Sequence, residues 1–123
     1  MSTPVGPYAP SLAAGDWLVC SGQVGISPGP DGPQLAEGFA AQTRQALHNV
    51  RQLLSDAGLS WPAVVKVTAF LADIGDYAEF NQLYLEELGD HRPARSVVAV
   101  AGLPLGARVE IEVWAWVGAS SGS

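Results

Sequence analysis

The sequence has only one cysteine, Cys20, and only six lysine and arginine residues against twelve aspartates and glutamates. One cysteine cannot form an internal disulfide, and it belongs to no pattern of cysteines and histidines with the spacing of a metal site. The chain does not open on a basic segment followed by an apolar one, and no apolar run approaches the roughly 20 residues that span a bilayer. We therefore expect a cytoplasmic protein with neither a metal site nor a membrane span.

Positive charge is scarce and also dispersed. The formal net charge is −6, and the cations form no basic run. They are Arg44, Arg51, Lys66, Arg92, Arg95 and Arg108. Because proteins bind polyphosphates mainly through clustered lysine and arginine, this pattern makes nucleic acid an unlikely partner. A small anion that needs only one arginine is compatible with it.

The composition is that of a globular protein with 48% hydrophobic and 15% charged residues. A chain of 123 residues has room for one core, so we expect a single domain over residues 1–123. Small and polar residues fill both ends and could not repay the entropy of ordering. We expect an ordered core over about residues 4–117 and a flexible C-terminal tail over 118–123.

Hydrophobic periodicity predicts two helices. Apolar residues at steps of three and four predict a helix over 36–57, and Asp76 with Glu79 predicts a capping box at the start of a second helix that ends at Gly89. Strands are predicted over 17–25, 64–72, 95–100 and 108–116, with a possible short strand over 11–13. The segment 27–34, rich in proline and glycine, is expected to be a surface loop.

The order of these elements predicts an α+β fold with a mixed sheet and both helices on one face. A turn at 102–106 is expected to join the strands 95–100 and 108–116 as an antiparallel pair. In the last strand Glu110, Glu112, Trp114 and Trp116 point away from the apolar side. Two tryptophans are too much apolar surface for water, so we expect this sheet face to be buried by oligomerisation.

The chemistry is concentrated at Arg95, which precedes the apolar run 97–100. A guanidinium beside an apolar strand needs an anion, because burying a charge alone is costly. That anion is either a substrate carboxylate or Glu110, in an ion pair that closes a subunit interface. Two further features favour a ligand site: Gly22 interrupts a strand, which marks a bulge or a close approach, and Tyr8 lies on a stiff proline segment.

Several short motifs, in this order and spacing, resemble the RidA family, also called YjgF/YER057c/UK114. The resemblance extends from about residue 4 to residue 116. It rests on Gly6-Pro7-Tyr8, Ser21-Gly22-Gln23, Asn81 with Tyr84, Pro93-Ala94-Arg95-Ser96 and Val109-Glu110-Ile111-Glu112. The last two blocks are specific to the family, whereas the Ser-Gly-Gln triplet alone is a weak signal.

The resemblance implies a chorismate-mutase-like fold that forms a homotrimer with ligand sites in the clefts between subunits. It also implies hydrolysis of reactive 2-enamine and 2-imine acids, such as 2-aminoacrylate and 2-iminopropanoate, to 2-keto acids and ammonia. No metal or organic cofactor is implied. The substrate would be a small imino acid, and the catalytic residues would be Arg95, which holds its carboxylate, and Glu110, which positions or activates water.

The same resemblance assigns substrate-binding positions to Tyr8, Ser21, Gly22 and Asn81, as well as to Arg95. Val97 is also a substrate-binding position, since its backbone N–H can bind a carboxylate, but it stands where many active members have a cysteine, so no thiol is available there. This departure keeps a second function open, a non-catalytic trimer that binds or senses small carboxylates. A third, cleavage of single-stranded RNA, fits poorly with the net charge.

Overall fold

The computed structural model describes residues 6–118 and contains seven strands and two α-helices. The behaviour predicted for residues 1–3 and for most of the tail lies outside these residues. The helices are α1 (Phe39–Asp56) and α2 (Tyr77–Leu88). The strands are β1 (Ser11–Ala14), β2 (Trp17–Val24), β3 (Ile26–Gly29), β4 (Gly32–Leu35), β5 (Val64–Leu71), β6 (Ala94–Ala99) and β7 (Val109–Trp116).

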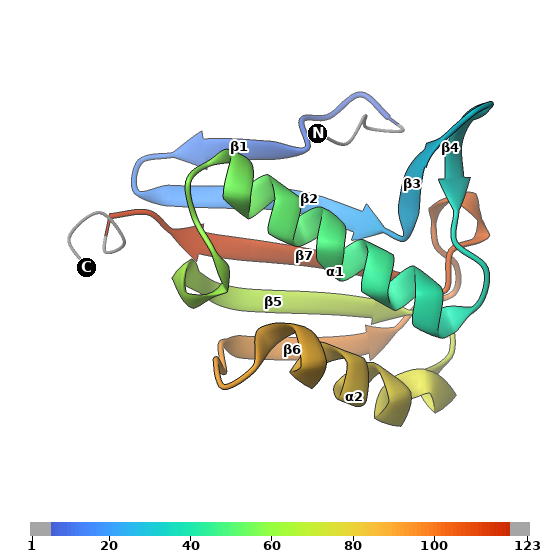
Figure 1. The fold of residues 1–123 in the computed structure, drawn as a ribbon. Coiled ribbons are helices and arrows are strands. Elements are labelled where there is room, and N and C mark those ends of the chain that lie inside the picture. The colour runs from blue at the N-terminus through green and yellow to red at the C-terminus, as the bar shows by residue number, and fades with distance from the viewer. Residues whose placement is uncertain (1–5, 119–123) are drawn as a thin grey trace.

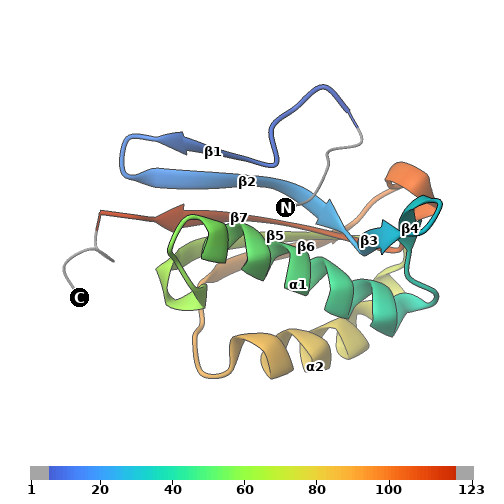
Figure 2. The ribbon, with the colours of Figure 1, turned by 45° about the horizontal axis from the view of Figure 1, so that its top comes forward.

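Five strands form one sheet in the order β1-β2-β7-β5-β6. Only β5 and β6 are parallel, and the other neighbours are antiparallel. Figures 1 and 2 show both helices on the same side of this sheet. The predicted α+β fold, with a mixed sheet and two helices on one face, is therefore confirmed.

The core lies between the sheet and the two helices. Val109, Ile111 and Val113 of β7 are each 0% exposed and belong to the same core cluster as Leu47 and Val50 of α1. The alternation in the last strand therefore predicted its buried side correctly. No helix within residues 6–118 is long and apolar enough to cross a membrane.

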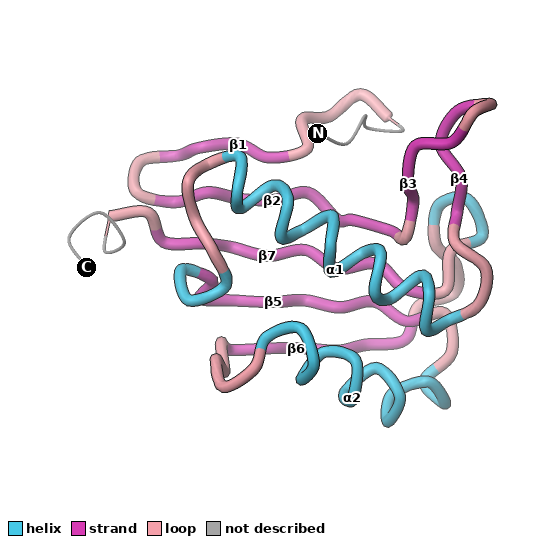
Figure 3. Tube along the Cα trace, viewed as in Figure 1, coloured by secondary structure: helices cyan, strands magenta, loops and turns pink. Residues whose placement is uncertain are grey.

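The segment expected to be a loop over 27–34 instead forms the hairpin β3–β4, a separate two-stranded sheet. Figure 3 shows it standing out at the end of β2. Pro28 pairs with Pro33 in its register. Proline lacks an N–H and is excluded from central strands, but a two-stranded ribbon has an outer edge on each strand where no donor is needed. The prediction failed because it considered only strands inside a larger sheet.

The predicted antiparallel pairing of the last two strands is wrong. β6 pairs with β5 in parallel at the edge of the sheet, whereas β7 lies between β2 and β5. The connection crosses past β5 through a short 3-10 turn, Pro104–Gly106. In the central position both edges of β7 are hydrogen-bonded and its apolar side faces α1, which pairing with β6 alone could not achieve.

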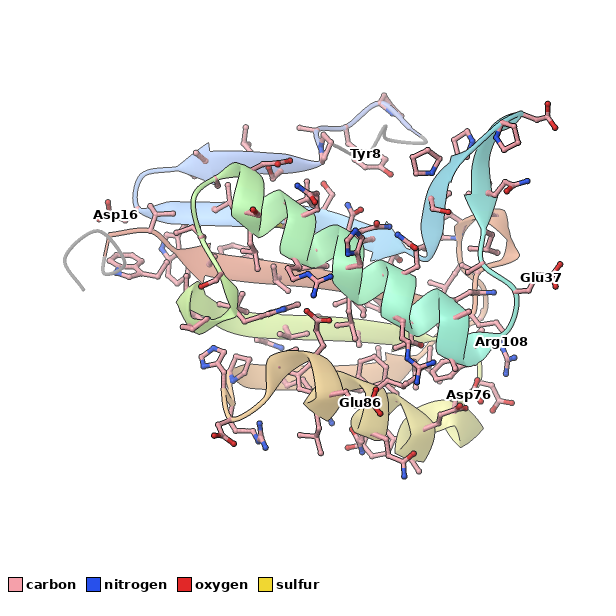
Figure 4. All side chains as sticks on the ribbon, in the orientation of Figure 1. Tyr8, Asp16, Glu37, Asp76, Glu86 and Arg108 are labelled. Atoms are coloured by element: carbon pink, nitrogen blue, oxygen red, sulfur yellow. The ribbon has the colours of Figure 1, made fainter. Side chains whose placement is uncertain are left out.

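The predicted capping box of the second helix is also wrong. Asp76 is the N-cap residue of α2, but its side chain makes no capping hydrogen bond. It accepts a hydrogen bond from Arg108 at 3.0 Å instead, and Figure 4 shows the two residues side by side. The Asp76 carboxylate therefore pairs with the guanidinium of Arg108, just before β7, and does not cap the helix N-terminus as the local sequence pattern predicted.

The sheet face opposite the helices is only partly covered within the chain. Val65, Val98 and Trp114 are each 44% exposed. β5 is an interior strand of the sheet, but its second face is not covered by another part of residues 6–118. Burial of this face by other copies of the chain remains a prediction.

Candidate active site

A cavity of about 430 Å³ lies at the C-terminal end of β2. The segment that carries Tyr8, the hairpin β3–β4, and one side of α1 surround it. Three residues that the sequence placed at the site, Tyr8, Gly22 and Glu110, line this cavity. They come from three separate parts of the chain, so only the tertiary structure brings them together.

Gly22 lies at an irregularity of β2 that gives Glu110 its space. The register of β2 against β7 shifts between Cys20 and Gln23, as in a β-bulge. A Cβ atom on Gly22 would lie 2.7 Å from Cδ of Glu110 and closer still to Oε2. The glycine is therefore required by the carboxylate beside it, and both features expected of Gly22, a bulge and a close approach, are present.

The surroundings of Glu110 alter its acidity. Burial raises the pKa of this carboxyl above its ordinary value, and the negative charge of Glu112, two residues along the strand, raises it further. A carboxyl with a raised pKa keeps a proton to higher pH and is a better base when ionised. Glu110 thus has the properties of a group that exchanges protons with a ligand or a water molecule.

Ser21 holds the Tyr8 segment against β2. Its hydroxyl donates to the carbonyl of Ala9 at 2.6 Å, and its backbone N–H donates to the carbonyl of Pro10 at 2.8 Å. Tyr8 is 44% exposed, and Figure 4 shows it beside the end of β2. Ser21 therefore acts on the cavity through the backbone of its neighbours rather than by lining it.

Asn49 of α1 is a site residue that the sequence reasoning missed. It is 9% exposed, and its amide donates to the carbonyls of Val24 at 3.1 Å and Ile26 at 2.9 Å. Gln45 in turn donates to the Asn49 carbonyl oxygen at 2.9 Å. These bonds fix the corner between β2 and β3, next to Glu110. The available signal was the position of Asn49 beside the apolar stripe of the helix, where a polar residue needs partners.

The second group of site candidates lies at the other edge of the sheet. Arg95 on β6 points to the helix side, where it donates to the hydroxyl of Tyr77 at 3.2 Å. Val97 on the same strand packs against the core. Asn81 of α2 has a buried side-chain oxygen with no hydrogen-bond partner among the described residues. These three predicted positions thus surround the contact between α2 and β6.

The two groups do not meet within one chain. Across the sheet, Arg95 of β6 pairs with Val67 of β5, and Val67 pairs with Val113 of β7. Val113 lies three residues along β7 from Glu110. Two strand spacings and three residues along a strand amount to roughly 13 Å between backbones. The side chains also lie on opposite faces, since Arg95 contacts α2 whereas Glu110 alternates with the core residues of β7. One small substrate could not touch both within a single copy.

The remaining reactive groups are a buried thiol and an exposed imidazole. Burial raises the pKa of Cys20 to about 11, so little of this thiol is ionised at neutral pH. His48 is exposed, lines the same cavity as Glu110 and bonds to Arg51 at 2.7 Å. Within residues 6–118 no three histidine, cysteine, aspartate or glutamate side chains gather as metal ligands would.

The fold places the chain in the class of small α+β proteins with a chorismate-mutase-like mixed sheet. A family model described as endoribonuclease L-PSP matches residues 1–117. The chain belongs to this family, the RidA family that its motifs resemble.

Relatives and solved structures agree with that assignment. A human protein named 2-iminobutanoate/2-iminopropanoate deaminase is 38% identical over 108 residues, which cover 88% of this chain and 78% of the relative. RidA from an Antarctic Psychrobacter superposes with a TM-score of 0.87 at 36% identity, covering 94% of this chain and 92% of that one. TdcF from E. coli, solved with bound serine, has a TM-score of 0.83 at 33% identity, with coverage of 92% and 90%.

Proposed function

We propose that this protein hydrolyses small 2-imino and 2-enamino acids, such as 2-iminopropanoate and 2-aminoacrylate, to 2-keto acids and ammonia. The observation that carries the proposal is Arg95, whose guanidinium has no carboxylate within 4.0 Å among residues 6–118. Relatives named for this activity are 38% and 39% identical to the chain. The reaction transfers no electrons, so it needs no redox cofactor.

Arg95 is the proposed carboxylate anchor. A planar guanidinium can donate two parallel N–H bonds to one carboxylate, which fixes both position and orientation. Asn81 lies on the same side of α2 as Tyr77 and Tyr84, one turn away, and its unpaired oxygen could accept a hydrogen bond from the N–H of the substrate. These residues would hold the imino acid, with the backbone N–H of Val97 beside it.

Glu110 is the proposed acid and base. As a base it takes a proton from water while the oxygen bonds to the imine carbon and the C=N electron pair moves to nitrogen. As an acid it returns the proton to that nitrogen, which gives an amino alcohol. Transfer of the remaining hydroxyl proton to the nitrogen then lets the C–N bond break, which releases ammonia and forms the C=O group. A raised pKa suits both steps, because the group must gain and lose the proton near neutral pH.

The proposed site is composite. Because Arg95 and Glu110 lie on opposite faces and two strands apart, one substrate can meet both only if they come from different copies of the chain. We propose that residues 1–123 act as one domain and assemble into a homotrimer, with Tyr8, Gly22 and Glu110 of one copy facing Asn81, Arg95 and Val97 of the next. The partly exposed sheet face would then be the contact surface.

The test is imine loss in solution. 2-Aminoacrylate is generated continuously by a serine dehydratase, and its disappearance is followed with and without the protein. We expect wild-type protein to shorten the imine lifetime, and Arg95→Lys to lose most of this activity, because a single ammonium cannot replace the planar two-bond contact. Unchanged lifetimes with wild-type protein would reject the proposal, and near-wild-type turnover by Arg95→Lys would reject the two-bond role.

A second candidate function is non-catalytic binding of small carboxylates. The relative solved with bound serine favours it, and so does Val97 in place of a cysteine. Calorimetry with pyruvate and serine separates the two functions. Binding that depends on Arg95 in a protein without turnover would support the second one.

RNA cleavage is a third candidate, raised by the description of the family model. Three of the six cations, Arg44, Arg51 and Arg108, already pair with carboxylates, which leaves little charge for a polyphosphate. RNA cleavage that survives rigorous purification and disappears in Arg95→Ala would support it.

A further inference from the structure

Arg95 differs from the other arginines in what surrounds its charge. Arg44, Arg51 and Arg108 each lie within 4.0 Å of a carboxylate, and Arg92 donates to the carbonyls of Gly89 and His91 at the end of α2. The guanidinium carbon of Arg95 lies over aromatic rings instead. The centroids are 5.8 Å away for Tyr77, 5.7 Å for Phe80 and 4.8 Å for Tyr84.

These three rings come from one face of α2. Their spacing of three and four residues brings them onto the same side of the helix. Phe80 and Tyr84 are 0% and 4% exposed, and their ring centroids are 5.7 Å apart, so they form a buried floor. Tyr77 is 41% exposed and forms the outer wall, with its hydroxyl accepting from Arg95.

We propose that Tyr77, Phe80 and Tyr84 form an aromatic cradle that positions Arg95 and takes the place of a carboxylate counter-ion. The face of an aromatic ring attracts a cation through its quadrupole but does not bind both nitrogens of the fork as a carboxylate would. The charge is thereby stabilised while donors remain available for an incoming anion. This inference rests on the proposed function only in naming that anion as the substrate carboxylate.

Tyr77 is the residue to change, because it is half exposed and its loss leaves the core intact. Two variants separate its parts: Tyr77→Phe keeps the ring and removes the hydroxyl, and Tyr77→Leu removes both. A third, Tyr77→Glu, supplies the counter-ion that the cradle replaces, and a glutamate in the first turn favours the helix. Leu85→Ala is the matched control, since Leu85 is an exposed apolar residue of the same helix.

The first readout is the NMR signal of the Arg95 side-chain Nε–H in the free protein, assigned with Arg95→Lys. A guanidinium over ring faces should show a ring-current shift that Tyr77→Leu reduces and Tyr77→Phe and Leu85→Ala preserve. The same signal is then titrated with pyruvate. We expect Tyr77→Leu to bind pyruvate at least about threefold more weakly than wild type does. Tyr77→Phe should bind it with nearly wild-type affinity, and Tyr77→Glu with the lowest affinity of the three variants.

The second readout is turnover of the imino acid. The cradle predicts a raised KM with little change in kcat for Tyr77→Leu, rescued in Tyr77→Phe. Pyruvate affinity equal to wild type in both Tyr77→Leu and Tyr77→Glu would overturn the cradle, as would an Arg95 signal that no Tyr77 variant moves. A wild-type protein that binds pyruvate at Arg95 but hydrolyses no imine would instead overturn the proposed function and leave the cradle supported.

Discussion

Glu110 is the residue whose ionisation distinguishes the two interpretations of Arg95. If Arg95 is unpaired in the free protein and binds a substrate carboxylate, burial and the charge of Glu112 keep the pKa of Glu110 above its ordinary value. If Arg95 of a neighbouring copy pairs with Glu110, the positive charge lowers that pKa instead. The two interpretations therefore predict opposite pH dependences.

The first prediction compares the thermal stability of wild type and Glu110→Gln between pH 4 and pH 8. With a raised pKa, the folded protein holds the proton more tightly than the unfolded chain, so protonation favours folding. The contribution of Glu110 to stability is then fully present below its ordinary pKa of 4.5 and is lost as pH rises through the folded pKa. We expect the melting temperature of wild type, relative to the variant, to fall with rising pH. A relative rise would indicate the ion pair.

At the scale of elements, the bulge in β2 and the corner between β2 and β3 set the position of the glutamate. Gly22 leaves the space that the carboxylate fills, and Asn49 fixes the backbone that follows the bulge. Gly22 controls the geometry at the proposed proton-transfer group, and Asn49 mainly controls stability. A change at Gly22 should therefore alter imine hydrolysis, whereas a change at Asn49 should alter the free energy of unfolding.

The second prediction concerns Gly22→Ala. The new methyl group would overlap the Glu110 side chain and displace its carboxylate, so imine hydrolysis should fall about tenfold to 100-fold while the protein stays folded. Gly102→Ala is the control, because a Cβ there meets nothing within 4 Å and its φ is not in the left-handed region. Equal activities of the two variants would show that the Glu110 position is unimportant.

The third prediction concerns Asn49→Ala, which leaves the carbonyls of Val24 and Ile26 without their donor. Losing partners for buried groups should lower the free energy of unfolding by about 1–3 kcal/mol. Gln52→Ala on the same helix removes a bond to the exposed Asp56 and should cost less than about 0.5 kcal/mol. Chemical denaturation of both variants measures the difference, and similar losses would contradict the assigned role of Asn49.

At the scale of the whole molecule, the proposed site is incomplete in one copy. The edge strand β6 carries the proposed anion-binding group, Arg95, and the central strand β7 carries the proposed proton-transfer group, Glu110, on the other face. Light scattering should give a solution mass three times that of the 12.8 kDa chain. A monomeric protein with full activity would reject the composite site.

The fourth prediction uses mixed assemblies. Arg95→Ala and Glu110→Ala should each be inactive, because each removes one half of every site. Equal amounts of the two variants are mixed, unfolded and refolded together. This should restore about a quarter of the wild-type sites, because in random assembly the copy that supplies Arg95 and the copy that supplies Glu110 are each intact at that residue half of the time. No recovery from a mixture shown by native mass spectrometry to contain mixed trimers would place both residues in one copy.

The sequence alone determined the features that depend on the pattern of neighbouring residues. Apolar steps of three and four predicted α1, alternation predicted the buried side of β7, and a glycine inside a strand predicted the bulge at Gly22. The family motifs identified Arg95 and Glu110, although their roles remain predictions. These signals succeed because helix and strand periodicity and glycine geometry act over only a few residues.

Only the tertiary structure decided which elements became neighbours. It placed β7 between β2 and β5, paired the prolines of β3 and β4, and gave Asp76 to Arg108 rather than to its own helix. It also put Arg95 and Glu110 on opposite faces, so the proposed site that uses both needs a second copy. Each outcome reflects competition among distant groups for hydrogen bonds, charge and burial, and a local pattern carries no information about which distant partner is available.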